Sequence, residues 1–181
     1  MNYSVEWLMK QKNPEFLFFW GHQPSKDGTI IKSCLSQWWP SNFKEGTTTY
    51  RTAEHYMMAK KAELFSDSEI AIAIVNTRFP KDVKALGRQI KNFDSEKWDE
   101  AKFNIVKQGN YLKFSQNAAL KQFLQETKNK VLVEASPSDA IWGIGLPETD
   151  PKATKPGEWR GQNLLGFALM EVRDEFKNQS K

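Results

Sequence analysis

The chain has 181 residues, a formal net charge of +4 and a hydrophobic content of 39%. This length fits one domain and buries enough surface to fold without a disulfide or a structural metal. No apolar run approaches the ~18 residues of a membrane-spanning helix, and the N-terminus lacks the apolar region of a secretory signal. We therefore expect a cytoplasmic protein that does not contact a membrane.

The cysteine and histidine counts exclude several kinds of site. Cys34 is the single cysteine, so neither an intramolecular disulfide nor a cysteine zinc cluster can form. The two histidines, His22 and His55, are far apart in the sequence, and no calcium-type acidic loop is present. We expect neither a metal nor a cofactor.

Short elements are predicted for the first fifty residues. Val5, Leu8 and Met9 follow helical spacing until Pro14 interrupts it. The predicted elements are this helix, a buried aromatic strand at 16–20, a turn at 24–28, a candidate return strand at 29–31, an irregular aromatic segment at 37–43 and a strand at 47–50.

Helices dominate the rest of the chain, where capping residues and apolar spacing indicate their ends. They are predicted at 53–65, at 66–76, from Pro80 to about Ile90, at 95–114, at 117–127 and at 163–176, with a strand at 131–135 and a loop-rich stretch at 137–161. The predicted fold class is mostly α with a small β-sheet (α+β). Residues 1–14 are expected to form a helical extension and residues 15–178 a single domain.

A carboxylate stands in the first turn of the helix predicted at 53–65. Glu54 has two interpretations. As a partner of the helix dipole it contributes about 0.3–1 kcal/mol. As a catalytic group it shares a helix face with Met57 or Met58 and with Lys61, because residues three, four and seven apart align. A carboxylate and an ammonium would then point into one cavity.

A glycine-rich loop follows the strand predicted at 131–135. Gly143 and Gly145 can adopt positive φ and let the backbone approach a ligand closely. Asp139 is either a turn cap or a catalytic group, and Trp142 is either a core anchor or a stacking wall.

A third segment, at 159–166, contains Asn163 directly before the last predicted helix. We expect Asn163 to be the N-cap of that helix and also to fix the preceding loop.

In their order along the chain, these segments resemble the NADAR, or YbiA-like, family. The matching motifs lie at 41–43, 54–61, 87–88, 97–98, 138–146 and 161–173, and the resemblance runs from about Phe18 to Phe176. The Asp-x-x-Trp-Gly-x-Gly and Gly-x-Asn-x-Leu-Gly elements are specific. The resemblance implies a single multihelical YbiA-like domain and an N-glycosidase.

The resemblance also implies substrates and site residues. The C1–N bond cleaved would belong to a phosphoribosylamino-pyrimidine of the riboflavin pathway or to an ADP-ribosylated guanine, including one in DNA or RNA. The implied catalytic residues are Glu54, Asp139 and Lys61, and the expected substrate-binding residues are Asn42, Phe43, Arg88, Trp98, Trp142, Gly143 and Gly145. Lys60 departs from the polar uncharged residue expected there, and helical phase favours Lys61 as the inward ammonium.

Two mechanisms suit these residues. Glu54 and Asp139 can stabilise oxocarbenium character, activate water and protonate the leaving nitrogen. Alternatively, the Lys61 amine attacks C1 of a ring-opened ribosylamine and forms a Schiff base. Trp98 and Trp142 could stack on the base, and Arg88 or Lys61 could hold phosphate.

Two other function classes stay open. One is a non-catalytic module that binds ADP-ribose or a related nucleotide in the same cavity. The other is a nucleic-acid-binding domain, suggested by the positive charge and the aromatic residues. We rank it last because no clustered basic helix or known nucleic-acid-binding motif is present. It remains an accessory property if the substrate is modified DNA.

Overall fold

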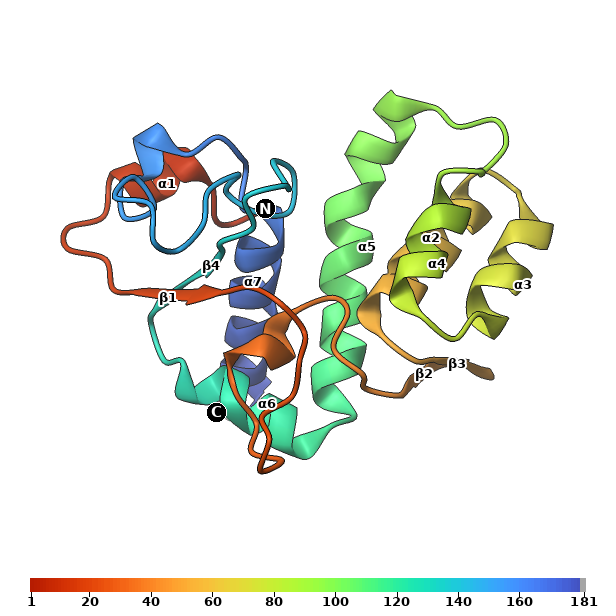
Figure 1. Ribbon diagram of the computed structural model, residues 1–181, viewed down its shortest axis with the longest axis horizontal. Coiled ribbons are helices and arrows are strands. Elements are labelled where there is room, and N and C mark those ends of the chain that lie inside the picture. Colours follow the sequence, from red (N-terminus) through yellow and green to blue (C-terminus); the bar gives the residue numbers. More distant parts are fainter. Residues whose placement is uncertain (180–181) are drawn as a thin grey trace. The chain divides into compact units, whose positions relative to one another are not determined.

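The computed structural model describes residues 1–179, which form two compact units (Figure 1). The central unit is residues 37–118. The terminal unit combines residues 1–36 with the chain from Ala119 onward. Within residues 1–179, no helix is both long and apolar enough to cross a membrane.

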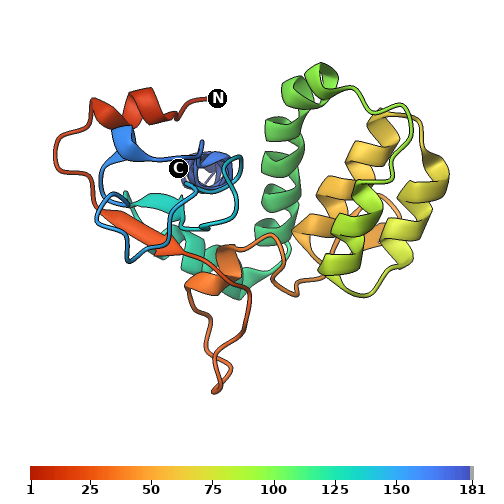
Figure 2. The same ribbon diagram turned by 45° about the horizontal axis from the view of Figure 1, so that its top comes forward.

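The central unit is a hairpin followed by four helices. Its elements are β2 (Phe43–Glu45), β3 (Thr48–Tyr50), α2 (Ala53–Leu64), α3 (Ser68–Asn76), α4 (Pro80–Gly87) and α5 (Ser95–Ser115). The strands are antiparallel, with Phe43 opposite Tyr50. In Figures 1 and 2, α2, α3 and α4 lie together on one side of α5.

Local side-chain bonds start three of the four helices of the central unit, and the caps of α2 and α5 are the predicted ones. The fourth, α4, begins with Pro80 and has no side-chain cap. The Thr52 hydroxyl accepts a hydrogen bond from the His55 backbone at the start of α2, and Asp94 accepts from two backbone amides at the start of α5. Asp67 does the same for α3, so this helix begins two residues later than predicted. Such bonds satisfy amides that the helix itself leaves without partners.

The terminal unit contains the two chain ends. Its elements are α1 (Val5–Met9), β1 (Phe16–Phe19), the 3-10 helix η1 (Lys32–Leu35), α6 (Ala118–Glu126, which begins at the last residue of the central unit), β4 (Val131–Glu134), the 3-10 helix η2 (Pro156–Glu158) and α7 (Leu164–Gln179). β1 and β4 pair in parallel, with Phe16 opposite Val131.

The last helix packs directly on β4. The predicted core positions of α7 are fully buried: Leu165, Leu169, Val172 and Phe176. Gly166 makes the close approach of α7 to β4 possible, because a Cβ there would lie 2.1 Å from the Leu132 carbonyl oxygen. A larger residue would therefore push the helix off the strand.

One predicted strand is absent, and one predicted helix ends earlier than expected. Residues 29–31 do not form a return strand. There the Thr29 backbone donates to Asp27 and its carbonyl accepts from Ser25, so local bonds take the place of a strand partner. Ile90 lies beyond the end of α4 at Gly87, although it is buried as expected.

Candidate active site

The predicted carboxylate lies at the buried start of α2. Glu54 is 4% exposed, and its backbone N–H donates to the Gln37 carbonyl oxygen at 3.0 Å. Burying a carboxylate is costly unless the protein stabilises its charge. A dipole partner alone has no reason to leave solvent, so burial favours a role inside the protein for Glu54.

His55, which the sequence analysis left without a role, holds this helix start in place. Its Nε2 lies 3.0 Å from the Thr77 carbonyl oxygen, and its Nδ1 lies 2.8 Å from the Thr52 hydroxyl. Because a carbonyl only accepts, Nε2 carries the proton and Nδ1 accepts from Thr52. Burial lowers the pKa of His55. The neutral ring thus ties the start of α2 to the end of α3.

The Lys61 ammonium lies in an aromatic environment without a counter-ion. Its Nζ is 4.3 Å from the centre of the Phe93 ring and 5.5 Å from that of Trp98, and it donates to the Gly87 carbonyl oxygen at 3.2 Å. Within residues 1–179, no carboxylate forms a salt bridge with it. Desolvation by burial lowers the pKa of Lys61.

The neighbouring ammonium has the opposite surroundings. Lys60 forms salt bridges with Glu45 at 2.7 Å and Glu63 at 2.8 Å. Burial acts against its charge, but the hydrogen bonds to these carboxylates outweigh burial and raise the pKa of Lys60. Lys60 is therefore held in its charged form, whereas Lys61 is the more easily deprotonated amine.

Two other predicted binding residues lie close to Lys61. Trp98, in the first turn of α5, is partly exposed and forms one wall beside the ammonium. Arg88 follows Gly87, whose carbonyl Lys61 contacts; it is exposed and forms no salt bridge within residues 1–179. Phe93 belongs to the same group, and the sequence analysis missed it. Its position just before the Asp94 cap was the available signal.

Asn42 and Phe43 differ in how much surface they offer. Asn42 is exposed, and its carbonyl accepts from the Asn117 side chain. Phe43 is 2% exposed and packs between Tyr50 and Tyr56, with ring centres 5.8 and 6.0 Å away. The Phe43 ring is thus part of the hydrophobic core. A role for Phe43 in substrate binding stays a prediction.

In the terminal unit, Asp139 organises its own loop. Its Oδ1 accepts from the backbone amides of Ile141 at 2.9 Å and Trp142 at 2.8 Å, which is the predicted turn-cap geometry. Within the described chain, no donor is hydrogen-bonded to Oδ2. Trp142 is partly exposed, which leaves ring surface for stacking.

The two loop glycines differ in backbone conformation, and only Gly145 has the positive φ predicted for both. Gly145 has the expected positive φ, 67°, but its N–H donates to the Asp139 carbonyl oxygen. Gly143 does not have positive φ. It is needed because a Cβ would lie 2.8 Å from the Glu134 carbonyl oxygen. Both glycines thus permit close approaches within the protein, and their contact with a ligand stays a prediction.

Asn163 corrects a second expectation. It precedes α7 at φ 55°, yet its side chain does not cap that helix. Its Oδ1 accepts from the Glu134 backbone N–H at 3.0 Å, and its Nδ2 donates to the Leu132 carbonyl at 2.9 Å. The amide therefore acts as a substitute strand partner for β4. Its backbone N–H bonds to the Gly143 carbonyl and fixes the loop, as expected.

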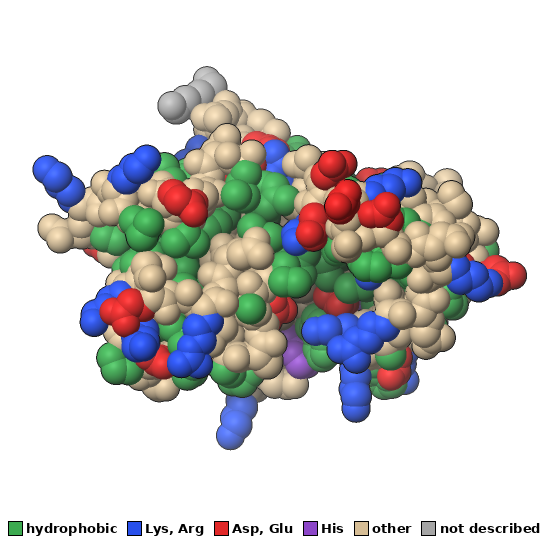
Figure 3. Space-filling view, turned by 90° about the horizontal axis from the view of Figure 1, so that it is seen from above, with side chains coloured by type: hydrophobic (Ala, Val, Ile, Leu, Met, Phe, Trp, Pro, Cys, Tyr) green, Lys and Arg blue, Asp and Glu red, His purple; other side chains and the backbone are tan. Residues whose placement is uncertain are grey.

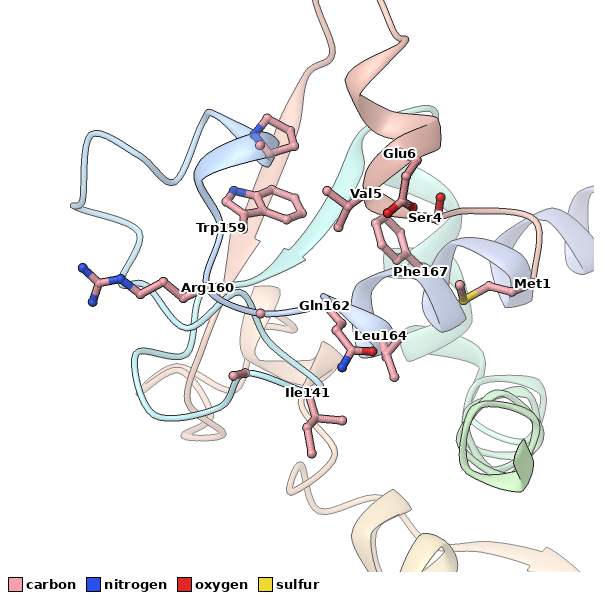
Figure 4. A pocket seen from close by; sticks show the side chains of 14 residues that line it. Met1, Ser4, Val5, Glu6, Ile141, Trp159, Arg160, Gln162, Leu164 and Phe167 are labelled. Atoms are coloured by element: carbon pink, nitrogen blue, oxygen red, sulfur yellow. The ribbon is translucent and has the colours of Figure 1, made fainter. Parts of the chain in front are cut away.

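A pocket of about 630 Å³ borders this loop (Figure 4). Ala140 and Ile141 line it, whereas the four predicted loop residues do not. Other lining residues come from the segment 156–167 and from the N-terminal segment, and Arg160 extends away from the other labelled side chains. Trp159 and Gln162 lie in the segment 159–166, which the sequence analysis singled out without giving these two residues a role.

The comparisons with known proteins identify the family of this chain. The model of the NADAR domain matches residues 18–177. The chain belongs to the NADAR family. It is 45% identical over 166 residues to N-glycosidase R617 of Acanthamoeba polyphaga mimivirus, covering 89% of this chain and 96% of that protein. It is 31% identical over 137 residues to N-glycosidase YbiA of Escherichia coli, covering 76% of each.

The fold of the NADAR chain is also that of a solved relative. The NMR structure of Escherichia coli YbiA superposes with a TM-score of 0.74 at 25% identity, over 94% of this chain and 89% of that one. The predicted α+β class is thereby confirmed. Within residues 1–179, no group of three or more His, Cys, Asp or Glu side chains could hold a metal ion.

Proposed function

We propose that this chain is an N-glycosidase that cleaves the C1–N bond between ribose and a nitrogenous base. Membership of the NADAR family and relatives named N-glycosidases support the reaction class. We further propose that the substrate is a phosphoribosylamino-pyrimidine or an ADP-ribosylated guanine. Both combine a flat ring, a ribose and phosphate.

The observation that carries the proposed mechanism is the state of Lys61. A nucleophilic lysine must be deprotonated, and removing it from water without giving it a carboxylate favours the neutral amine. Lys61 has both properties, whereas Lys60 is also desolvated but is held by two carboxylates. We therefore favour covalent catalysis by Lys61 over direct attack of water.

The proposed reaction has four steps. The ring C1–O bond breaks, the ring oxygen takes a proton from Glu54, and a protonated imine forms between C1 and the base nitrogen. The neutral Lys61 amine adds to C1, and a proton moves from Lys61 to the base nitrogen. The C1–N bond to the base then breaks, so the base leaves as an amine and a Schiff base joins C1 to Lys61. Water adds to C1, and the amine of Lys61 is released as the sugar aldehyde forms.

Glu54 is the proposed proton carrier for these steps. It lies seven residues before Lys61 on α2, which is two turns and about 10 Å along the helix axis. That spacing suits a carboxylate and an amine acting on different atoms of one substrate, or through a water. Its burial keeps competing bulk water from the proton that it transfers.

Aromatic rings supply the proposed contacts with the base and the sugar. Trp98 and Trp142 are both partly exposed, and stacking on a base contributes about 1–3 kcal/mol. Arg88 carries an exposed guanidinium suited to a phosphate. The proposed role of Asp139 is to shape the loop that carries Trp142, because its Oδ1 holds the Trp142 backbone.

A single set of assays tests the proposal. Purified protein is incubated in EDTA with a phosphoribosylamino-pyrimidine and, separately, with an oligonucleotide carrying an ADP-ribosylated guanine. Release of free base or of unmodified oligonucleotide is expected for at least one substrate. Tight binding of both without release would instead favour a non-catalytic binding module.

Borohydride added during turnover tests the covalent step. It reduces a Schiff base to a stable amine, so mass spectrometry should find the sugar mass on the peptide containing Lys61. Turnover with no adduct would return the reaction to attack of water assisted by Glu54 and Asp139. An adduct on Lys60 would show that the inward amine is the other one.

A further inference from the structure

The terminal unit contains a pocket on the opposite end of its strands from the Asp139 loop. Because β1 and β4 are parallel, with Phe16 opposite Val131, the segments that lead into them lie side by side. These segments, together with α1, line a pocket of about 410 Å³. The lining residues are Trp7, Gln11, Lys12, Asn13, Pro14, Glu15, Lys128, Asn129, Lys130 and Val131.

The charge of this pocket is concentrated in three lysines. Lys12, Lys128 and Lys130 are exposed, and none forms a salt bridge within the part of the chain that the structure describes. Glu15 is the one acidic lining residue. On the face drawn in Figure 3, basic and acidic side chains are interspersed. Three unpaired ammonium groups at one pocket indicate an anionic ligand.

The backbone that carries two of these lysines is fixed from behind by α7. The buried Arg173 donates from Nη1 to the Lys130 carbonyl and to the Thr127 hydroxyl, both at 2.8 Å. Lys177 donates to the Lys128 carbonyl at 3.0 Å. These cations hold backbone oxygens, while the ammonium groups of Lys128 and Lys130 stay exposed. The turn is therefore preorganised, which lowers the entropy cost of binding.

An aromatic ring stands beside the lysines. Trp7 is partly exposed, and its ring and that of Tyr3 form a T-shaped pair with a 4.7 Å centroid distance. The Tyr3 hydroxyl in turn donates to Asp174 on α7. The Trp7 indole N–H makes no hydrogen bond within residues 1–179. A fixed, accessible indole next to cations suits a ligand that combines bases with phosphates.

We propose that this pocket, the Trp7–Lys128 pocket, binds single-stranded nucleic acid. One base stacks on Trp7, and the backbone phosphates on either side contact Lys12, Lys128 and Lys130. An acidic peptide would satisfy the lysines but would leave the indole without a matching group. Trp7 and Lys12 precede residues 18–177, the range that the family model matches.

The proposal bears on the substrate of this chain. Only the purpose of the pocket depends on the proposed function: the pocket would hold a nucleic-acid strand that carries an ADP-ribosylated guanine. A free phosphoribosylamino-pyrimidine has a single phosphate and no neighbouring bases, so it gains nothing from this pocket. Binding to an unmodified strand requires no glycosidase activity and is measured separately.

Fluorescence anisotropy with a labelled, unmodified twelve-nucleotide DNA strand tests the pocket. Three phosphate contacts predict a slope of about −2 for log K against log salt. The variant K12Q/K128N/K130Q should lose most of that slope and at least 10-fold in affinity at low salt. Asn is chosen at Lys128 because φ there is 53°, which Asn tolerates well. W7A should weaken binding at least 5-fold with the slope unchanged.

Matched controls separate the pocket from general charge. The variant K26Q/K81Q/K84Q removes three exposed lysines elsewhere, and W20A removes a tryptophan that is 59% exposed. Both should bind the strand as the wild type does. Equal losses in these controls would overturn the proposal. So would binding of polyglutamate as tight as that of DNA, or unchanged DNA binding in W7A and the triple-lysine variant.

Activity assays of the same variants separate DNA binding from glycosidase activity. All pocket variants should cleave the phosphoribosylamino-pyrimidine at wild-type rates if that compound is turned over, because none of the changed residues belongs to the proposed active site. Their kcat/KM on an ADP-ribosylated strand should fall by the same factor as DNA binding. If the protein binds DNA through this pocket but has no glycosidase activity, the proposed function is wrong and the proposed DNA-binding site stands.

Discussion

The candidate catalytic groups of the two units have different surroundings. In the central unit, Glu54 is buried and Lys61 lies among aromatic rings without a carboxylate. In the terminal unit, the Asp139 carboxylate accepts from the backbone N–H groups of Ile141 and Trp142, and the Gly145 N–H donates to the Asp139 carbonyl. Under the proposed function, α2 therefore supplies the reactive groups, whereas the loop at 139–145 shapes the site.

The largest effect is expected from Lys61. Lys61→Arg keeps a positive charge but not a nucleophile, since a guanidinium does not deprotonate in this range. Covalent catalysis predicts that Lys61→Arg is as inactive as Lys61→Ala, with kcat reduced at least 10³-fold. Steady-state kinetics measure this, and Lys60→Arg is the matched control, expected to keep its salt bridges and near-normal turnover. An active Lys61→Arg would limit Lys61 to binding phosphate.

The pH dependence of activity also tests whether Lys61 is the nucleophile. Desolvation lowers the pKa of Lys61 below the usual value of about 10.4. The neutral amine therefore accumulates at lower pH than in an ordinary lysine, and log kcat/KM should rise with pH and level off below that value. For stability, the buried ammonium is unfavourable below its folded pKa, and this penalty fades as pH rises toward the unfolded pKa. A Lys61→Met variant should lack that rise in stability in thermal melts.

Glu54→Gln is expected to have the next largest effect. The isostere keeps the volume and the helix start but removes the exchangeable charge. A loss of at least 10²-fold in kcat, with a melting temperature close to or above that of the wild type, is expected for a group in acid–base catalysis. Near-normal kcat in the folded variant would reduce Glu54 to a structural residue at the start of α2.

Asp139 distinguishes a chemical from a shaping role in the terminal unit. Asn retains an oxygen that can accept from the amides of Ile141 and Trp142, whereas Ala does not. If Asp139 shapes the loop, Asp139→Asn should keep activity within about 10-fold and Asp139→Ala should lose both activity and stability, at about 1 kcal/mol for a lost cap. An inactive but well-folded Asp139→Asn would instead place the carboxylate in the chemistry.

The smallest effects are expected at the two aromatic walls. Trp98 and Trp142 are partly exposed, so replacement by Ala should cost less than the 3–5 kcal/mol typical of a fully buried aromatic residue. Each should raise KM about 5- to 100-fold if its ring stacks on the base. Melting curves with and without ligand separate binding from stability. Unchanged KM in both folded variants would remove the stacking role.

Local patterns in the sequence determined the helices and the candidates on them. The Thr52 and Asp94 caps and the spacing of Glu54 and Lys61 depend on residues within two turns of each other, and α2 and α5 begin where they predict. The resemblance to the NADAR family, also visible in the sequence, led to the confirmed fold class. The roles carried over with it to Glu54, Lys61 and Asp139 stay predictions.

Tertiary structure alone decided what surrounds each of these groups. Lys60 and Lys61 are adjacent and chemically identical in the sequence, yet one meets Glu45 from the β2–β3 hairpin and the other meets Phe93 and the Gly87 carbonyl. Likewise, Asn163 bonds to β4 instead of to its own helix. Burial and electrostatic partners come from segments distant in the chain, so no local pattern fixes whether an amine is charged or an amide caps a helix.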